Sequence, residues 1–157
     1  KKTVGTQGRS LKTKAPVFGM VQRSGNVVAV KTEDTKGKTL MSIIRQFVKP
    51  NSRIYTDEYI GYNTLTESEY THAVVNHGAK QYVDSDNYTN TIEGFWAQLK
   101  RMIYGIYHSV SSKYLQRYVD EAVFRYNTRK QSESDRFKYM FLKSIGVVQY
   151  RDILNVV

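Results

Sequence analysis

Two carboxylates stand where a nucleic-acid enzyme can use them. Asp57 directly follows a short apolar run that begins at Ser52, and Glu93 lies near the start of a later amphipathic stretch. Carboxylate oxygens are ligands that Mg²⁺ and Mn²⁺ prefer, and many phosphodiester transfers use two such ions about 3.5–4 Å apart. One ion activates the attacking hydroxyl and the other stabilises the leaving oxygen. Such a site needs at least three carboxylates, so Asp57 and Glu93 predict part of one.

The stretch from Asn90 predicts a helix with Glu93 and a lysine on one flank. At 100° per residue, Glu93 and Lys100 fall about 20° apart, and their spacing corresponds to about 10 Å along the axis. Both flank an apolar stripe, so we expect them at the edge of the core. There, Lys100 and its neighbour Arg101 can contact a DNA backbone as cations. The stripe consists of Ile92, Phe95, Trp96, Leu99 and Ile103.

Ordinary structural roles also explain these residues. Asn90 followed by Glu93 matches a capping box in which Asn replaces the usual Ser or Thr, and an acid in the first turn suits the helix dipole. An aspartate after a strand, such as Asp57, is commonly a turn residue. Trp96 occupies a position typical of a core side chain. Pattern alone therefore favours structural roles over metal catalysis.

The first half of the chain predicts strands around one helix. Val17–Gln22 and Val27–Thr32 form a predicted hairpin. Ser52–Thr56 predicts a third strand, and the strand–helix–strand order favours a crossover into the same sheet. Asp57 would then lie at the carboxyl edge, where open α/β sheets bind ligands. The intervening helix, which Pro50 ends, has apolar residues at Leu40, Ile43, Ile44 and Phe47.

The second half predicts one more strand and further helices. Thr71–Asn76 is a short predicted strand, and Gly105 is expected to end or loosen the helix with the two flanking charges. Ser111 or Ser112 is expected to cap the next helix, and Gly146 to end the last one. The apolar positions of these two helices are Leu115, Tyr118, Val119, Ala122, Val123 and Tyr126, and then Phe137, Met140, Phe141 and Ile145.

Composition favours a protein that binds a polyanion. The 157 residues are enough for one domain, and 24 Lys plus Arg against 14 Asp plus Glu give a net charge of +10. A basic balance favours nucleic acid as the partner, although it also occurs in proteins that bind none. Cysteine is absent, which excludes disulfides, thiolate metal sites and cysteine nucleophiles. No apolar run approaches the ~20 residues of a membrane span, and no signal peptide is visible. A cytoplasmic location without membrane contact is therefore expected.

Two other catalytic motifs are incomplete. Lys36-Gly-Lys-Thr39 resembles half of a phosphate-binding P-loop, but the first glycine of that motif would fall at Thr32. The 13 tyrosines suggest tyrosine recombination. That chemistry needs a His-hydrophobe-His pair or an Arg/His cluster around one tyrosine, and neither spacing is present.

Several short motifs follow one another along the chain. They are Tyr55-Thr-Asp57-Glu58-Tyr59, Val75-Asn-His77, Thr89-Asn-Thr-Ile-Glu93-Gly-Phe-Trp96-Ala-Gln-Leu-Lys100, Gly105-Ile-Tyr-His108, Leu115-Gln-Arg-Tyr-Val-Asp-Glu121 and Phe124-Arg-Tyr-Asn127. This series resembles the ISXO-like DDE transposases of bacterial insertion sequences, from about Thr13 to Arg129. The resemblance implies an α/β fold of the RNase H-like type, a mixed sheet flanked by helices. Strands 17–22, 27–32 and 52–56 would be its second, third and fourth.

The resemblance also implies roles for individual residues. The family's acids are an aspartate on the first strand, an aspartate after the fourth strand, and an acid on a later helix. Asp57 takes the second position and Glu93 the third, with two Mg²⁺ or Mn²⁺ ions expected in the complete site. Asn90 and His77 are candidates for supporting roles.

The first strand and its aspartate are expected to be missing from this fragment. The family places them upstream of a basic, Gly-rich segment like Lys1–Lys14, and Asp34 follows the third strand instead. The fragment is therefore expected to be inactive alone. We expect residues 1–14 to form a flexible basic arm, with Lys12 and Lys14 as candidate DNA contacts. Residues 15–146 would form the partial catalytic domain, and 147–157 a C-terminal tail.

The implied function is DNA transposition. An activated water would nick DNA at the ends of the element, and the freed 3′-hydroxyl would attack target DNA. The expected partners are both DNAs, bound by a homo-oligomer. The alternative is a non-catalytic, basic DNA-binding remnant of a transposase, which the charge of +10 and the missing acid also suggest.

Overall fold

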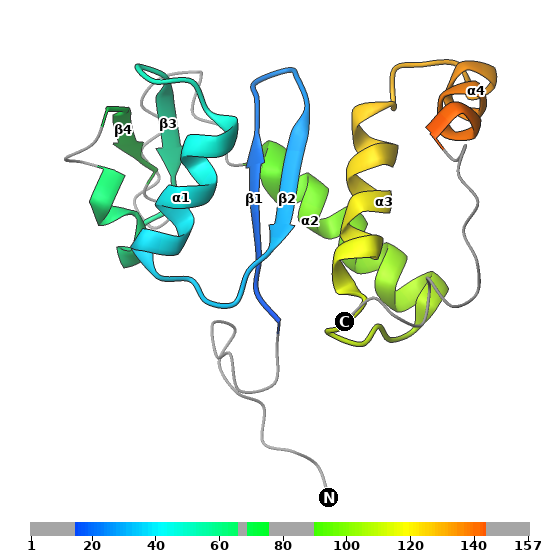
Figure 1. Ribbon diagram of the computed structural model, residues 1–157, viewed down its shortest axis with the longest axis horizontal. Helices are drawn as coiled ribbons and strands as arrows, with labels where there is room; N and C mark the ends of the chain where they lie inside the picture. Colours follow the sequence, from blue (N-terminus) through cyan, green and yellow to red (C-terminus); the bar gives the residue numbers. More distant parts are fainter. Residues whose placement is uncertain (1–14, 66–68, 76–89, 144–157) are drawn as a thin grey trace, which may run out of the picture. The chain divides into compact units, whose positions relative to one another are not determined.

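The structure, a computed structural model, describes residues 15–65, 69–75 and 90–143 (Figure 1). The chain forms two compact units, Lys1–Asn127 and Thr128–Val157. The described residues contain both strands and helices, and two small sheets are flanked by helices. The predicted α/β class is therefore confirmed. None of the described helices is long and apolar enough to cross a membrane.

The hairpin of β1 (Val17–Val21) and β2 (Val27–Lys31) is buried on both faces. Its strands pair antiparallel with Gly19 opposite Ala29, which confirms the predicted hairpin. Side chains alternate across a strand, so Ala29 enters one hydrophobic core and Phe18 enters the other. The near-continuous apolar run of each strand is typical of burial on both faces.

Helices α2 (Asn90–Met102) and α3 (Leu115–Asn127) cover one face of the hairpin. Phe95 is 1% exposed there, and its ring meets the Tyr126 ring edge-on at 5.8 Å. Both predicted apolar stripes are confirmed as core. The buried members from the two helices are Phe95, Leu99, Met102, Val119, Ala122 and Tyr126.

The segment between α2 and α3 differs in part from its prediction. A π-helical turn, η2 (Ile103–Tyr107), follows α2 and contains Gly105, which was expected to end or loosen the helix. The next helix begins at Leu115, later than a cap at Ser111 or Ser112 would place it. The reason is a preceding turn, in which the Leu115 N–H donates to the Ser112 carbonyl at 3.4 Å.

Helix α1 (Gly37–Phe47) covers the opposite face of the hairpin. Leu40 and Ile44 are buried against Phe18 in the second core. The prediction that Phe47 completes this apolar stripe is wrong, because its side chain is 51% exposed. The backbone becomes extended at Val48, which packs against the core instead.

A second sheet consists of β3 (Arg53–Thr56) and β4 (Thr71–Val74), which pair in parallel. The 3-10 helix η1 (Ile60–Leu65) lies between them in the chain. The predicted common sheet of β3 and the hairpin is not formed among the described strands, which make two separate sheets. The two sheets meet through side chains, because Phe18 of β1 and Ile54 of β3 contact the same core around α1.

Two side-chain amides of α3 close the outer edge of β2. Asn127 accepts the Val27 N–H at 2.7 Å and donates to the Val27 carbonyl at 2.9 Å. Gln116 accepts the Lys31 N–H at 2.6 Å and donates to the Ala29 carbonyl at 3.3 Å. These bonds take the place of a neighbouring strand and satisfy backbone groups that would otherwise need water.

The unit Thr128–Val157 contains one described helix, α4 (Glu133–Lys143). The Asp135 N–H donates to the Ser132 hydroxyl at 3.1 Å, which caps the first turn. The predicted helix is confirmed, and its apolar side chains are exposed, while Ile145 and Gly146 lie outside the described residues. The exposed side chains are Phe137, Tyr139, Met140, Phe141 and Leu142.

Substitution by alanine is expected to have opposite effects on stability at Gly19, which contacts the Trp96 ring, and at Gly94, which has open space around it. A Cβ at Gly19 would lie 2.5 Å from the Trp96 ring, whereas a Cβ at Gly94 meets nothing within 4 Å. Gly19→Ala is expected to lower the free energy of unfolding by about 1–3 kcal/mol through overpacking. Gly94→Ala, in an exposed helical position, is expected to raise it by about 0.5–1 kcal/mol. Urea unfolding followed by circular dichroism measures both, and equal effects would contradict the packing argument.

Candidate functional site

Asp57 lies at the carboxyl end of β3, in a turn that its own atoms help to hold. Its side chain is half-buried. The Tyr59 N–H donates to Asp57 Oδ1 at 3.2 Å, and the Thr56 hydroxyl donates to the Asp57 carbonyl at 2.8 Å. The side-chain bond to a backbone N–H two residues on is the turn role that the sequence suggested. It also fixes the direction of the carboxylate.

The residues after Asp57 are anchored to the start of α1 by Tyr59. The Tyr59 hydroxyl donates to the Thr35 carbonyl at 3.1 Å. Because that hydroxyl has one proton, the Thr35 hydroxyl must donate in the second contact, at 2.7 Å. The Tyr59 ring also meets the Tyr62 ring edge-on at 5.7 Å. The Asp57 turn is therefore tied to two parts of the fold.

His72 on β4 reaches the same strand end from the neighbouring strand. Its Nε2 lies 2.8 Å from the Thr56 hydroxyl oxygen. The sequence assigned no role to this histidine, because its neighbour in space is distant along the chain. Partial burial lowers the pKa of His72.

Glu93 is exposed in the first turn of α2. The Trp96 ring of the same helix contacts Gly19 of β1, and Gln98 lines a pocket that α2 shares with α3. At 100° per residue, Glu93 lies about 60° from Trp96 and about 140° from Gln98. Glu93 is therefore on the flank of α2 that faces away from α3, together with Lys100. Both side chains are exposed, whereas the sequence placed them at the edge of the core.

The face of each sheet that lies away from α1 follows from the packing of its strands. Ile54 of β3 packs toward α1, and alternation along the strand directs Tyr55 to the other face. Asp57 follows the strand, which ends at Thr56. Helix α2 covers the face of the hairpin that is likewise opposite to α1. Tyr55 and α2 thus lie on the faces of their sheets that are away from α1. Within the described ranges, no three Asp, Glu, His or Cys side chains form a metal-binding group.

The structure describes only some of the other predicted site residues. Lys100 and Arg101 are exposed on α2. The remaining predicted site residues lie outside the residues or side chains that the structure describes, and they are His77, Lys12, Lys14 and the side chain of Asn90.

Two arginines that the sequence did not single out flank an aromatic ring beside Asp57. Arg23, which follows β1, lies 5.6 Å from the centre of the Tyr55 ring. Arg53 lies 5.9 Å from the same ring. Cations at this range are attracted to the ring face. Positive charges therefore accumulate on the face of β3 that bears Tyr55.

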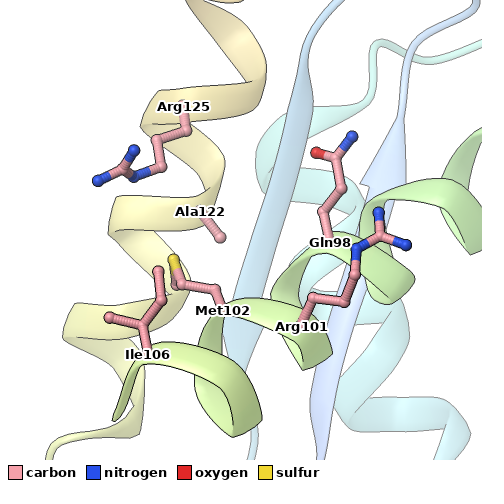
Figure 2. A pocket seen from close by; sticks show the side chains of 6 residues that line it. All are labelled: Gln98, Arg101, Met102, Ile106, Ala122 and Arg125. Carbon is pink, nitrogen blue, oxygen red and sulfur yellow. The ribbon is translucent and has the colours of Figure 1, made fainter.

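A shallow pocket of about 240 Å³ lies between α2, η2 and α3 (Figure 2). Met102, Ile106 and Ala122 supply its apolar lining, with Arg101 and Arg125 at its margins. Arg125 is paired with Glu121 at 2.8 Å. The pocket is on the α3 side of α2, opposite to the Glu93 flank, so it is separate from Glu93.

Comparison with known proteins identifies relatives. The ISXO2-like transposase domain matches residues 1–127 of the chain. A transposase-like protein from Haemophilus influenzae is 33% identical over 101 residues, which cover 64% of this chain and 80% of that protein. No solved structure matches the chain. The matched domain includes both Asp57 and Glu93.

Burial of His72 predicts a pH dependence of folding. A histidine whose pKa is lower in the folded state binds fewer protons there than in the unfolded chain. Its contribution to stability is therefore complete above about pH 6.5 and is lost as the pH falls toward the folded pKa. Urea midpoints of the wild type are expected to decrease between pH 7.5 and 5.5, and those of His72→Gln to decrease less. Identical slopes in the two proteins would contradict the assignment.

Proposed function

The chain belongs to the ISXO2-like transposase family, as its motifs predicted, and we propose that it acts in DNA transposition as a metal-dependent catalytic domain of the DDE type. Asp57 and Glu93 would supply two of the acids. We infer that the two acids share the side of the sheets away from α1, and the packing of α1 and α2 supports this inference. Asp57 directly follows β3, in which Tyr55 alternates with the α1-facing Ile54, and Glu93 lies on the flank of α2 that faces away from α3.

One edge of β1 pairs with no strand of the described residues, and this edge supports the proposal of an RNase H-like fold. The bonds from Gln22 N–H to Asn26 and from Thr32 N–H to Pro16 set the alternation of the hairpin ladder. In an antiparallel pair, every second residue directs its backbone groups to the other edge. For β1 these outward residues are Val17, Gly19 and Val21.

The edge of β3 away from β4 can pair with the same strand as the outer edge of β1. Thr71 and Val75 donate to the carbonyls of Ser52 and Thr56 at 3.1 and 2.8 Å. The backbone groups of the alternate residues of β3 therefore point away from β4. Figure 1 shows β3 between β4 and β1. A strand that pairs with both edges would join the two sheets into one mixed sheet, and we place the family's first aspartate on that strand.

The donor set fits hard divalent cations. Asp57 and Glu93 offer carboxylate oxygens, which suit Mg²⁺ or Mn²⁺, and the aspartate on the joining strand would complete the set. When bound, two ions activate the attacking oxygen and stabilise the leaving one. The Tyr59 N–H, 3.2 Å from Asp57 Oδ1, keeps that carboxylate in one orientation. Lys100, on the same flank as Glu93, would hold the DNA backbone beside the acids.

Charge supports DNA as the substrate. The net charge is +10, and exposed cations lie on α2 as well as around Tyr55. Each cation that neutralises a phosphate releases counterions, so binding of this kind weakens steeply with salt. We propose that the protein binds the ends of its element and target DNA as a homo-oligomer in the cytoplasm. The alternative, a DNA-binding remnant without catalysis, is favoured by the same charge and by the lack of a three-acid group in the described residues.

Substitution of Asp57 or Glu93 is expected to reduce catalysis while DNA binding is kept. In protein expressed from its full reading frame, Asp57→Asn and Glu93→Gln are each expected to reduce cleavage and strand transfer more than about 100-fold, because each removes a metal ligand. DNA affinity, measured by fluorescence anisotropy across a salt series, is expected to be unchanged or slightly higher. Glu58→Gln is the matched control, since Glu58 is an exposed acid next to Asp57, and it is expected to keep full activity.

The same assays decide between the two functions. Strand transfer that survives Asp57→Asn would show that the proposed site is wrong. Salt-sensitive DNA binding by a wild-type protein that neither cleaves nor joins DNA with Mg²⁺ or Mn²⁺ would favour the remnant.

A further inference from the structure

We propose that Thr56 and His72 are positioning residues for Asp57, linked to it by a directed chain of hydrogen bonds. The inference rests on the proposed function of Asp57 as a metal ligand. The chain runs from the His72 ring to the Thr56 hydroxyl, and from there to the backbone of Asp57. The two contacts are 2.8 Å each.

The direction of this chain follows from counting protons. A carbonyl oxygen can only accept, so the Thr56 hydroxyl proton must point to the Asp57 carbonyl. That hydroxyl has no second proton for His72. The ring must therefore donate from Nε2–H to the Thr56 oxygen, which assigns the tautomer of the neutral histidine. Partial burial, which lowers the pKa of His72, favours this neutral form.

The chain acts where the sheet ends. The Thr56 carbonyl still bonds to its neighbour strand, since it accepts the Val75 N–H at 2.8 Å. β4 ends at Val74, one residue before that donor. The Asp57 carbonyl is thus beyond the regular ladder, and the Thr56 hydroxyl satisfies it. Thr56 is 8% exposed, so water has little access to compete for this bond.

Both ends of Asp57 are held as a result. Its carbonyl accepts from the Thr56 hydroxyl, and its Oδ1 accepts from the Tyr59 N–H at 3.2 Å. Fixing the peptide and the side chain together restricts the directions that the carboxylate can take. A metal ligand that is held by outer hydrogen bonds loses less conformational freedom when the ion binds.

His72 and Thr56 share one face of the sheet. It pairs in register with Ile54, which packs toward α1, and Thr56 shares that face by alternation. Asp57 directly follows Thr56. We therefore infer that His72 acts on Asp57 through Thr56.

Paired substitutions test the chain in protein expressed from its full reading frame. Thr56→Val removes the hydroxyl at nearly constant volume, and Thr56→Ser restores it. His72→Phe removes the ring donor, and His72→Gln keeps an N–H at a similar reach. Mn²⁺ binding is titrated by the loss of the free-ion EPR signal, apart from any assay of activity. Thr56→Val and His72→Phe are expected to weaken Mn²⁺ binding about 10–100-fold, and Thr56→Ser and His72→Gln to stay near the wild type.

A double substitution distinguishes one chain from two separate contacts. Because both residues act through the same bonds, Thr56→Val/His72→Phe is expected to weaken Mn²⁺ binding no more than the stronger single change. Hydrogen exchange of the Tyr59 amide in metal-free protein is expected to become faster in Thr56→Val and to recover in Thr56→Ser. The exchange measurement also applies if a variant loses stability, because it is compared with global unfolding of the same protein.

Two results would overturn the inference. One is equal Mn²⁺ affinity in Thr56→Val and Thr56→Ser, and the other is additive losses in the double variant. If Asp57→Asn abolishes strand transfer while these variants bind Mn²⁺ like the wild type, only the positioning role fails. If Asp57→Asn keeps strand transfer, the proposed function itself fails.

Discussion

Burial of the hairpin β1–β2 on both faces is the constraint on which the unit Lys1–Asn127 depends. Its two apolar faces need two separate covers, and α1 supplies one while α2 and α3 supply the other. The missing side chain of Gly19 lets the Trp96 ring approach the strand, which sets where α2 lies. The position of Glu93 is therefore a consequence of hydrophobic packing.

The position of Asp57 also depends on the hairpin, but indirectly, through α1. α1 packs on β1 and also on β3, so the core around Phe18 determines which face of the second sheet is free. Polar contacts then act locally, at the strand end. The structural and catalytic interpretations of Asp57 are compatible, because the bond that makes it a turn residue also orients its carboxylate.

The sequence predicted what local periodicity and motif order encode. The hairpin, α1, α2, α3 and the position of Asp57 after a strand follow from the spacing of apolar residues, and the family follows from linked motifs. The separation of the sheets could not be predicted, since strand pairing depends on backbone bonds between distant residues. His72 was missed for the same reason: its partner Thr56 is on another strand. Gln116 and Asn127 were indistinguishable from other polar helix residues until their bonds to β2 were visible.

The amides of Gln116 and Asn127 also make the two edges of the hairpin different. They already occupy the edge of β2, so a further strand can add to the edge of β1 more easily. A free strand edge is a template on which other chains can add strands and build aggregates. At β2 the donors and acceptors of Val27 are already taken by Asn127, so intermolecular pairing cannot start there without dissociating α3. Loss of α3 by partial unfolding or proteolysis would expose that template, and self-association would then compete with refolding.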